Sequence, residues 1–296
     1  MIEKKRIKIL ITGSRGFIGD YLHELLQNDY NIFEYDLDFK NRDIRDKFKL
    51  DRLFDKERFD VVIHLAARAG VRTGEEFPDE FISTNINGTK NIIEACEKYK
   101  VKQLISFSSS SVLGGNIDIK GKKIEPLKED DNYNPKSLYA ISKVVGEMML
   151  KNSNLNYTII RPFTVYGENG RKDMVIYKWI EQIKRGEKLT VFGDGKSKRG
   201  YTNVNDLVDG VKRCILNEKA YHQTIHLGGS EVISLVDLML MFNEYLEKDM
   251  CLNRLPMPKA DVMESWTNSD KAKKLLGWEP KANFKEYLTN ILTKEL

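Results

Sequence analysis

The sequence has few cysteines, and they fit neither a disulfide framework nor a metal site. Three occur among 296 residues, at Cys96, Cys214 and Cys251. Their number is odd, and their spacing matches no common metal-binding pattern. Cysteines of this kind are usual in a reducing compartment, where disulfides do not persist. We therefore expect reduced thiols with a structural role, and no metal site.

The sequence also lacks long apolar runs and a large excess of one charge. The apolar segment at residues 7–11 is too short for the core of a signal peptide, and no segment approaches the ~18 apolar residues of a membrane span. The 48 basic and 44 acidic residues leave a net charge of +4, whereas proteins that bind nucleic acids usually have a clustered basic face. We therefore expect a cytoplasmic protein that binds neither membranes nor nucleic acids.

Short apolar segments alternate with helical stretches through the first half of the chain. The expected strands cover residues 7–12, 32–35, 61–65, 104–108 and 157–160. Between the last two, an amphipathic helix is indicated by the i, i+3, i+4, i+7 spacing of Ile141, Val144, Val145 and Met148. Repeated strand–helix–strand units form parallel sheets with helices on both faces. The expected fold class is therefore α/β, with a Rossmann-type doubly wound parallel sheet.

The first expected strand leads into a loop with three regularly spaced glycines, Gly13, Gly16 and Gly19. Glycines there permit a tight turn and let the backbone approach a pyrophosphate, which the N-terminus of the next helix stabilises. Asp36 ends the following strand, where an acid accepts hydrogen bonds from a ribose 2′-hydroxyl. These features predict a dinucleotide site. Its expected contacts are Gly13, Arg15, Gly16, Phe17, Ile18 and Gly19 in the loop, Asp36 at the ribose, and Asp43 and Ile44 near the adenine.

Two charged residues of this site point to different cofactors. The Asp36 carboxylate favours NAD, because it repels the 2′-phosphate of NADP. Arg15 favours NADP if its side chain reaches that phosphate, and has no such effect if the side chain is solvated. We predict NAD as the cofactor and leave NADP open because of Arg15.

A candidate catalytic pair follows in the second half of the dinucleotide-binding region. Tyr139 and Lys143 are four residues apart, on one face of the expected helix. A free tyrosine has a pKa of about 10. A nearby lysine and a positive nicotinamide ring would both lower it and create a general base. Four serines, residues 108–111, end the preceding strand, where parallel sheets bind ligands.

Together these motifs resemble the extended short-chain dehydrogenases/reductases, in particular the NAD-dependent sugar-nucleotide epimerase/dehydratase family. The resemblance runs over residues 7–278 and includes Asn85 and the segment 161–167. It implies that Tyr139 is the base, that Lys143 assists it and that Ser109 bonds the reacting sugar oxygen. It also implies that the cofactor cleft is lined by His64, Leu65, Ala66 and Ala67.

Within the family, the reaction and the sugar are suggested by finer features. The family's 4,6-dehydratases carry Asp-Glu after the catalytic hydroxyl, where this chain has Ser110 and Ser111, which argues against dehydration. Segments 69–72, 137–140, 164–174 and 262–271 look like UDP-glucuronate 4-epimerases. The substrate contacts that this resemblance implies are Ser109, Ser110, Thr164, Arg171, Val191, Arg199 and Asp261.

Two arginines have separate roles in this interpretation. Arg171 would bind the uronate carboxylate, since its planar fork donates two parallel hydrogen bonds; alternatively it pairs with a protein acid or a phosphate. Arg199 matches the family's diphosphate-binding arginine. Three departures from the pattern are Leu113 in place of a tyrosine, Gly200 in place of an acid, and the short stretch 36–43, which also occurs in 4-ketosugar reductases.

We therefore expect NAD-dependent 4-epimerisation of a UDP-sugar, UDP-glucuronate or UDP-galacturonate, by transient oxidation at C4. An NAD(P)H-dependent reductase of a nucleotide-linked 4-keto sugar is the alternative, and a non-catalytic dinucleotide sensor is a remote one. Residues 1–165 would form the NAD-binding Rossmann domain and residues 166–296 a smaller α/β lobe for the nucleotide sugar, with some exchange of strands and helices. The resemblance also implies a homodimer that pairs through helices near residues 85–99 and around Tyr139.

Overall fold

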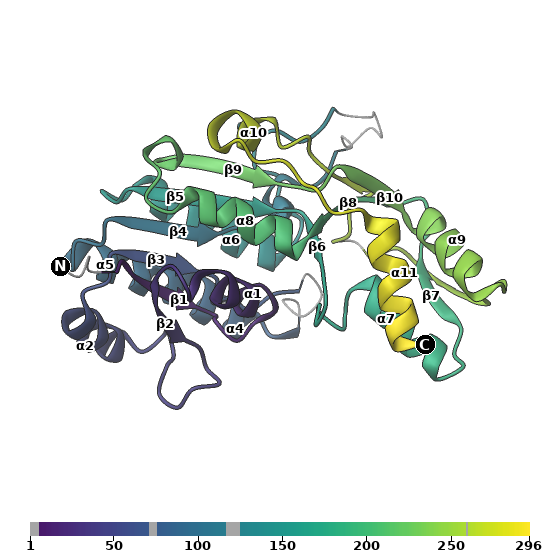
Figure 1. Cartoon of the computed structure of the whole chain (residues 1–296), viewed down its shortest axis with the longest axis horizontal. Helices are drawn as coiled ribbons and strands as arrows, with labels where there is room; N and C mark the ends of the chain where they lie inside the picture. The colour runs from purple at the N-terminus through teal and green to yellow at the C-terminus, as the bar shows by residue number, and fades with distance from the viewer. Residues whose placement is uncertain (1–5, 71–75, 117–124, 259) are drawn as a thin grey trace.

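The computed structural model describes residues 6–70, 76–116, 125–258 and 260–296. Its largest element is a parallel sheet of six strands in the order β2-β1-β3-β4-β5-β9. The strands are β1 (Lys8–Thr12), β2 (Asn31–Tyr35), β3 (Val61–His64), β4 (Gln103–Phe107), β5 (Tyr157–Pro162) and β9 (Gln223–Leu227). Helices cover both faces of the sheet (Figure 1). This is the Rossmann-type α/β fold that the sequence predicts.

The central strands are buried along their whole length, as expected of a parallel sheet between two helical layers. Every residue of β3 and β4 is buried. Alternate residues of β1 face opposite layers: Ile9 and Ile11 belong to one core cluster, and Leu10 belongs to the other. Because both faces are covered, these strands are nearly continuous apolar runs.

The two helical layers come from different parts of the chain. One layer contains α1 (Phe17–Leu26), α8 (Val204–Cys214) and α10 (Asp270–Leu276). The other contains α2 (Lys47–Glu57), α5 (Thr89–Lys98) and α6 (Leu138–Lys151). Shorter helical turns are α4 (Pro78–Phe81), the π-helical η1 (Ile82–Gly88) that leads into α5, and the 3₁₀ turns η2 (Ser110–Leu113) and η3 (Glu218–Ala220).

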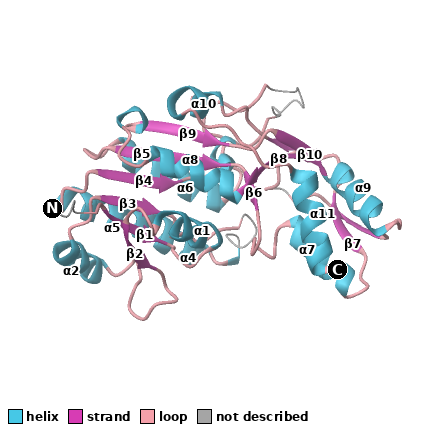
Figure 2. Cartoon of the chain, in the orientation of Figure 1, coloured by secondary structure: helices cyan, strands magenta, loops and turns pink. Residues whose placement is uncertain are grey.

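A small lobe stands beyond one end of the large sheet and contains the C-terminus (Figures 1 and 2). Its strands are β6 (Thr164–Tyr166), β7 (Leu189–Phe192), β8 (Lys198–Asn203), β10 (Glu231–Ser234), β11 (Leu252–Leu255) and β12 (Glu264–Ser265). Its helices are α7 (Val175–Lys184), α9 (Leu235–Leu246) and α11 (Phe284–Glu295). The chain does not stay in this lobe: between β8 and β10 it forms α8 and β9, which belong to the large sheet and its helical layer. A boundary at residue 165 therefore separates the two parts only approximately.

The large sheet ends at β2, which pairs only with β1 in the part of the chain that the structure describes. The full dinucleotide fold has a further strand outside this position. Here the chain passes from β2 to α2 through the turns at residues 36–46. The short stretch at residues 36–43 therefore replaces the additional edge strand of the full fold. The switch point between β1 and β3 is still present.

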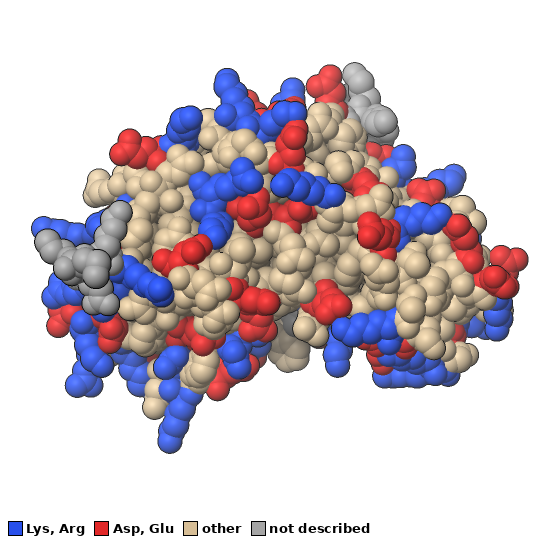
Figure 3. Space-filling view, viewed as in Figure 1, with Lys and Arg blue, Asp and Glu red and all other residues tan. Residues whose placement is uncertain are grey.

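Charges of both signs are mixed over the face shown in Figure 3. Lysines and arginines are interspersed with aspartates and glutamates, so no broad basic surface is seen on that face. Within the described ranges, no helix is both long enough and apolar enough to cross a membrane.

Candidate active site

A cleft of about 660 Å³ lies at the carboxyl ends of the large sheet and extends to the small lobe. It is the place where open α/β sheets bind ligands, next to the switch point in strand order. The predicted site residues that line it are Gly13, Gly16, Phe17, Ile18, Gly19, Asp36, Asp43, Ile44, Leu65, Ala66, Ala67, Ser109, Ser110, Tyr139, Lys143, Thr164, Arg171, Arg199 and Asp261. Arg15, His64 and Val191 are the expected residues that do not line it.

At the start of the cleft, the backbone of the glycine loop lies directly against neighbouring backbone segments. Gly13 has φ +73° and donates its N–H to the carbonyl of Tyr35 at 2.8 Å. A Cβ on Gly13 would lie 2.7 Å from the backbone nitrogen of Ala66, and one on Gly19 would overlap the Gly13 carbonyl. At the start of α1, Gly16 supplies no side-chain cap. The first N–H groups of α1 therefore fit the pyrophosphate of a dinucleotide.

Asp36 is held at the end of β2 by two backbone donors. Its carboxylate accepts hydrogen bonds from the N–H groups of Arg15, at 3.0 Å, and Asp38, at 3.2 Å. The Arg15 guanidinium lies 3.6 Å from Glu34 and 5.5 Å from the ring centroid of Phe39. The Arg15 side chain is thus directed toward Glu34 and Phe39, while its backbone N–H orients Asp36.

Arg42 is a cleft residue near Asp43 that the sequence did not indicate. Arg42 lines the cleft and stacks on two rings, 5.1 Å from the centroid of Phe33 and 4.4 Å from that of Phe39. Its guanidinium also donates to the Glu34 carbonyl at 2.6 Å. No motif marks such a residue, because its position depends on how the short loop folds. Asp43 is fixed nearby by Arg45, whose hydrogen bonds hold the Asp43 pKa below its ordinary value.

The predicted base lies in the first turn of α6, which Ser137 caps by accepting the N–H of Ala140 at 3.2 Å. Ser109 lies close enough to Tyr139 for hydrogen bonding to lower the Tyr139 pKa. The expected lowering of the Tyr139 pKa is not found in the protein alone. Burial raises this pKa, while the Ser109 hydrogen bond and the charge of Arg171 oppose the rise. A phenolate at neutral pH therefore depends on further positive charge beside the ring.

Lys143 lies one turn after Tyr139, on the same face of α6. Its ammonium donates to the carbonyl of Phe107 at 2.8 Å and lies 6.0 Å from the Tyr139 ring centroid. Burial lowers the Lys143 pKa to about 8, and the charge of Glu147 opposes this fall. Lys143 is thus poised to change its charge close to neutral pH.

His64 is buried beneath the cleft and does not line it, contrary to the expectation from the family. Its Nδ1 lies 2.7 Å from the hydroxyl oxygen of Thr12, and its Nε2 lies 3.0 Å from that of Thr89. Burial and the charge of Lys143 lower the His64 pKa to about 3. The ring is therefore neutral and joins β1, β3 and α5, while the next three residues form the cleft wall.

The far end of the cleft contains the two arginines expected at the sugar and the diphosphate. Arg171 donates to both carboxylate oxygens of Asp173, at 3.0 Å and 2.6 Å. Arg199 donates to the carbonyls of Lys198, at 2.8 Å, and Met263, at 3.3 Å. Burial lowers the Arg199 pKa, and the Asp261 charge opposes this. Asp261 thus places a negative charge close to Arg199.

Val191 is not brought to the cleft. Its side chain is 3% exposed and belongs to the core of the small lobe, together with Trp179, Leu189 and Phe242. Its place on β7 directs it into that core. The predicted substrate contact at Val191 is therefore not seen in the structure.

Two further features of the sequence motifs are now placed. Leu113 is buried in a cluster with Val112 and Phe163, and the cleft wall beside it is made by Gly114 and Gly115. Both glycines have positive φ, +70° and +97°, so the chain turns sharply directly after Leu113. Ala69 lines the cleft, whereas Val71 and Arg72 of the same motif lie outside the described residues.

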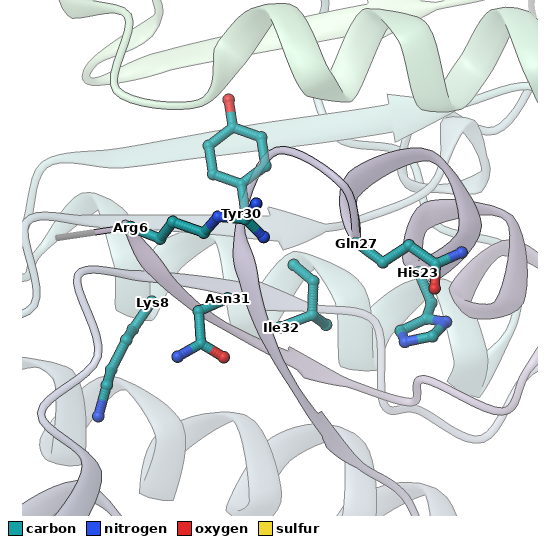
Figure 4. Close-up of a pocket in the computed structure, with 7 residues that line it drawn as sticks. All are labelled: Arg6, Lys8, His23, Gln27, Tyr30, Asn31 and Ile32. Atoms are coloured by element: carbon teal, nitrogen blue, oxygen red, sulfur yellow. The ribbon is translucent and has the colours of Figure 1, made fainter. Parts of the chain in front are cut away.

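A second hollow, of about 400 Å³, lies at the opposite edge of the sheet, where β1 and β2 begin (Figure 4). Its side chains do not converge: Tyr30 and Lys8 point in opposite directions. The Lys8 ammonium is engaged by the Glu57 carbonyl at 2.9 Å and the Glu57 carboxylate at 3.3 Å. Because the polar side chains of this hollow do not point at one place, we take the large cleft as the candidate active site.

The glycine loop, Asp36 and the side chains of Tyr139, Ser109 and Lys143 line one cleft. The model of the NAD-dependent epimerase/dehydratase family matches residues 9–228. The chain belongs to this family. It is an NAD-dependent sugar-nucleotide epimerase of the short-chain dehydrogenase type.

Relatives match over nearly the whole chain. A UDP-glucuronate 4-epimerase of Thermodesulfobacterium geofontis is 31% identical over an aligned length of 309 residues. The match covers 94% of this chain and 93% of the relative. The UDP-glucuronic acid 4-epimerase of Bacillus cereus, solved with UDP-glucuronic acid and NAD, is 29% identical and superposes with a TM-score of 0.85 over 97% of this chain and 99% of its own. The UDP-glucose 4-epimerase of Thermotoga maritima, solved with UDP-glucose, is also 29% identical, with a TM-score of 0.87 over 97% and 98% of the two chains.

Proposed function

We propose that this enzyme interconverts UDP-glucuronate and UDP-galacturonate by transient oxidation at C4. The observation that carries the proposal is the position of Arg171. Its guanidinium lines the same cleft as Tyr139 and is close enough for its charge to lower the Tyr139 pKa. A cation beside the proposed base suits a sugar that bears a carboxylate next to its reacting carbon. The Bacillus cereus enzyme, with UDP-glucuronic acid in its structure, supports the same substrate.

Each residue of the cleft has a defined task in this reaction. Tyr139, as phenolate, takes the proton of the C4 hydroxyl, and Ser109 hydrogen-bonds the same oxygen. Lys143 keeps the phenolate charged by its positive charge. NAD⁺ bound along the glycine loop and Asp36 would supply reversible hydride transfer at C4. Tyr139 then returns the proton, so no net oxidation results.

The substrate's acidic groups are assigned to two arginines at different depths. Arg199 is the proposed diphosphate ligand, since its guanidinium lines the cleft beside Asp261. Arg171 is the proposed uronate ligand, with Thr164 as a hydroxyl donor on the adjoining strand β6. The sugar would rotate about its diphosphate while Arg199 holds that group, which presents either face of C4 to the same base.

One experiment separates this function from its alternatives. Purified enzyme is incubated with UDP-glucuronate, UDP-glucose and nucleotide-linked 4-keto sugars, with and without NADPH, and the products are resolved by NMR. Epimerisation of UDP-glucuronate without added reductant supports the proposal. Reduction of a 4-keto sugar with equimolar consumption of NADPH would replace it with the reductase. Cofactor binding with no turnover of any sugar would indicate a sensor, which the shared Tyr139–Ser109–Lys143 cleft argues against.

We also infer a homodimer that pairs through η1, α5 and α6. Ile82 on η1 and Ile141 and Met148 on α6 are 43%, 45% and 48% exposed. Helices that present apolar side chains to solvent commonly pair in a four-helix bundle. Light scattering at micromolar concentration should give twice the chain mass, and a monomer mass would contradict the inference.

A further inference from the structure

Three side chains on α6 contact three consecutive residues at the end of β4. Tyr139, Lys143 and Glu147 are four residues apart and therefore share a face of the helix. Lys143 donates to the carbonyl of Phe107, and Tyr139 lies close enough to Ser109 for hydrogen bonding. The residue between these two, Ser108, donates its hydroxyl to Glu147 at 2.5 Å. The reaction as proposed uses the first two contacts and gives no role to the third.

Glu147 is a buried carboxylate, and each of its two oxygens accepts two hydrogen bonds. Its side chain is 1% exposed, as is that of Arg161 on β5, which donates to both of its oxygens at 2.8 Å and 2.7 Å. Tyr133 adds a third partner by donating its hydroxyl at 2.7 Å. These bonds keep the Glu147 pKa below its ordinary value, against the effect of burial. The Glu147 carboxylate is therefore a fixed negative charge in the C-terminal half of α6.

A buried ion pair of this kind is a poor device for stability alone. Removing two charges from water is costly, and apolar side chains of similar volume often serve a fold as well or better. Glu147 and Arg161 lie where α6 packs against β5. If these two positions served only packing, we would expect apolar side chains there. The retained pair instead fixes the hydroxyl of Ser108, which directly precedes the proposed catalytic Ser109.

We propose that Glu147 is a positioning residue of the reaction, a role that rests on the proposed function of Tyr139, Lys143 and Ser109. Through Ser108 it sets the position of Ser109 against Tyr139. Through its charge it keeps Lys143 protonated. Arg161 holds the Glu147 carboxylate in the orientation that both effects need.

The charges around Lys143 agree with the second effect. Tyr139 and Glu147 flank it on its own helix, neutral His64 lies beneath it on β3, and the Phe107 carbonyl meets it from β4. Among the described residues, Glu147 is the anion that raises the Lys143 pKa, against the burial that lowers it to about 8. Losing that anion, with the cation of Arg161 left in place, should lower the Lys143 pKa further. The alkaline limb of the pH–rate profile, where Lys143 loses its proton, should then move to lower pH.

The test compares Glu147→Gln with Tyr133→Phe. Both remove a partner from the same buried network, but only the first removes the charge and weakens the link to Ser108. In Glu147→Gln, kcat at pH 8 should fall at least about tenfold, as expected for a disturbed general base, with little change in KM. The alkaline limb should move down by about one pH unit, within the usual effect of a neighbouring charge. Tyr133→Phe should keep the wild-type profile.

A double variant controls for damage to the fold. Replacing Glu147 by Leu and Arg161 by Met removes both charges and leaves no buried charge unpaired. Thermal unfolding should show this variant folded, while kcat stays low, because Ser108 and Lys143 have both lost their partner. Recovery of stability and kcat together would overturn the positioning role. So would a folded Glu147→Gln with wild-type kcat and an unmoved alkaline limb.

A measurement without any sugar separates this proposal from the proposed function. The Lys143 pKa can be followed in the NAD-bound enzyme by NMR of lysine labelled with ¹³C at the ε-carbon, with the signal assigned through Lys143→Arg. A lower Lys143 pKa in Glu147→Gln supports the charge effect even if no UDP-sugar is turned over. An unchanged Lys143 pKa contradicts it even if the wild type is an active epimerase.

Discussion

Arg171 and Asp173 form a two-pronged ion pair at the sugar end of the cleft. The Nε and Nη2 atoms of Arg171 lie 3.0 Å and 2.6 Å from the two carboxylate oxygens of Asp173. The side chains of Arg171 and Asp173 are 40% and 61% exposed, so water weakens their attraction. A uronate carboxylate would need the same guanidinium edge. Under the proposed function, Asp173 would therefore compete with the substrate carboxylate for Arg171.

Asp173→Asn should lower the KM for UDP-glucuronate. An exposed pair of this kind is worth about 0.2–1 kcal/mol, so the expected gain in affinity is at most about fivefold. The KM for UDP-glucose should not change, because a hexose has no carboxylate to exchange for Asp173. Steady-state kinetics on both sugars provide the measurement. A rise in KM for UDP-glucuronate would show that Asp173 orients Arg171 for the substrate and does not compete with it.

Arg171→Ala should impair the uronate far more than the matching hexose. A charge-assisted hydrogen bond contributes about 1.5–3 kcal/mol, which corresponds to about a tenfold to hundredfold loss of kcat/KM for UDP-glucuronate. Arg171→Lys should recover only part of this loss, since it keeps the charge without the two-pronged geometry. Arg185→Ala serves as the control, because Arg185 is an exposed arginine that pairs with Glu181 on α7. Equal losses on both sugars would assign Arg171 to the fold or the diphosphate.

Tyr139→Phe should abolish turnover and leave the fold and NAD binding intact. The ring packs edge-on against Phe81 with centroids 6.3 Å apart, and phenylalanine preserves this contact. Loss of general-base catalysis typically costs about 10²–10⁴-fold in rate. Thermal unfolding and titration with NAD check the fold, and kcat checks the chemistry. Activity within about tenfold of wild type would remove Tyr139 from the role of base.

The sequence predicts five strands of the large sheet because they are apolar runs, and it misses the sixth, β9. The strand expected at residues 157–160 is β5, Tyr157–Pro162, and the strand expected at 32–35 is β2, Asn31–Tyr35. It does not predict β8, Lys198–Asn203, whose polar sequence becomes a strand by pairing with β6, β10 and β12. Strands of this type are specified by partners far away in sequence, and no local pattern marks them.

The site divides in the same way. Motif residues such as Gly13 and Tyr139 reach the cleft because fixed spacing along a turn or a helix places them there. Side-chain partners are not encoded so locally. The pairing of Arg15 with Glu34 and of Arg171 with Asp173 depends on the folded loops. The raised pKa of Tyr139 depends on burial, which spacing alone does not give.

Asp36→Asn should shift the cofactor preference of the enzyme toward NADP. Asparagine keeps an oxygen that can accept the N–H of Arg15, now bonded to the carboxylate at 3.0 Å, and it removes the negative charge. Arg42 lines the cleft beside this position, so a 2′-phosphate would meet a cation and no anion. A hydrogen bond to a charged group contributes about 1.5–3 kcal/mol. The affinity for NADP should therefore rise at least about tenfold, while the affinity for NAD falls.

Calorimetric titration of wild type and variant with both cofactors measures this shift. Asp38→Asn is the matched control, because it removes the same charge from an exposed residue two positions away that does not line the cleft. If the control gains as much NADP affinity as Asp36→Asn, the effect is one of general charge and not of the ribose contact. If neither variant gains, the Arg42 stack on Phe33 and Phe39 holds its cation away from the phosphate. In that case NAD selectivity resides in the folded loop after β2, and the Asp36 carboxylate adds little to it.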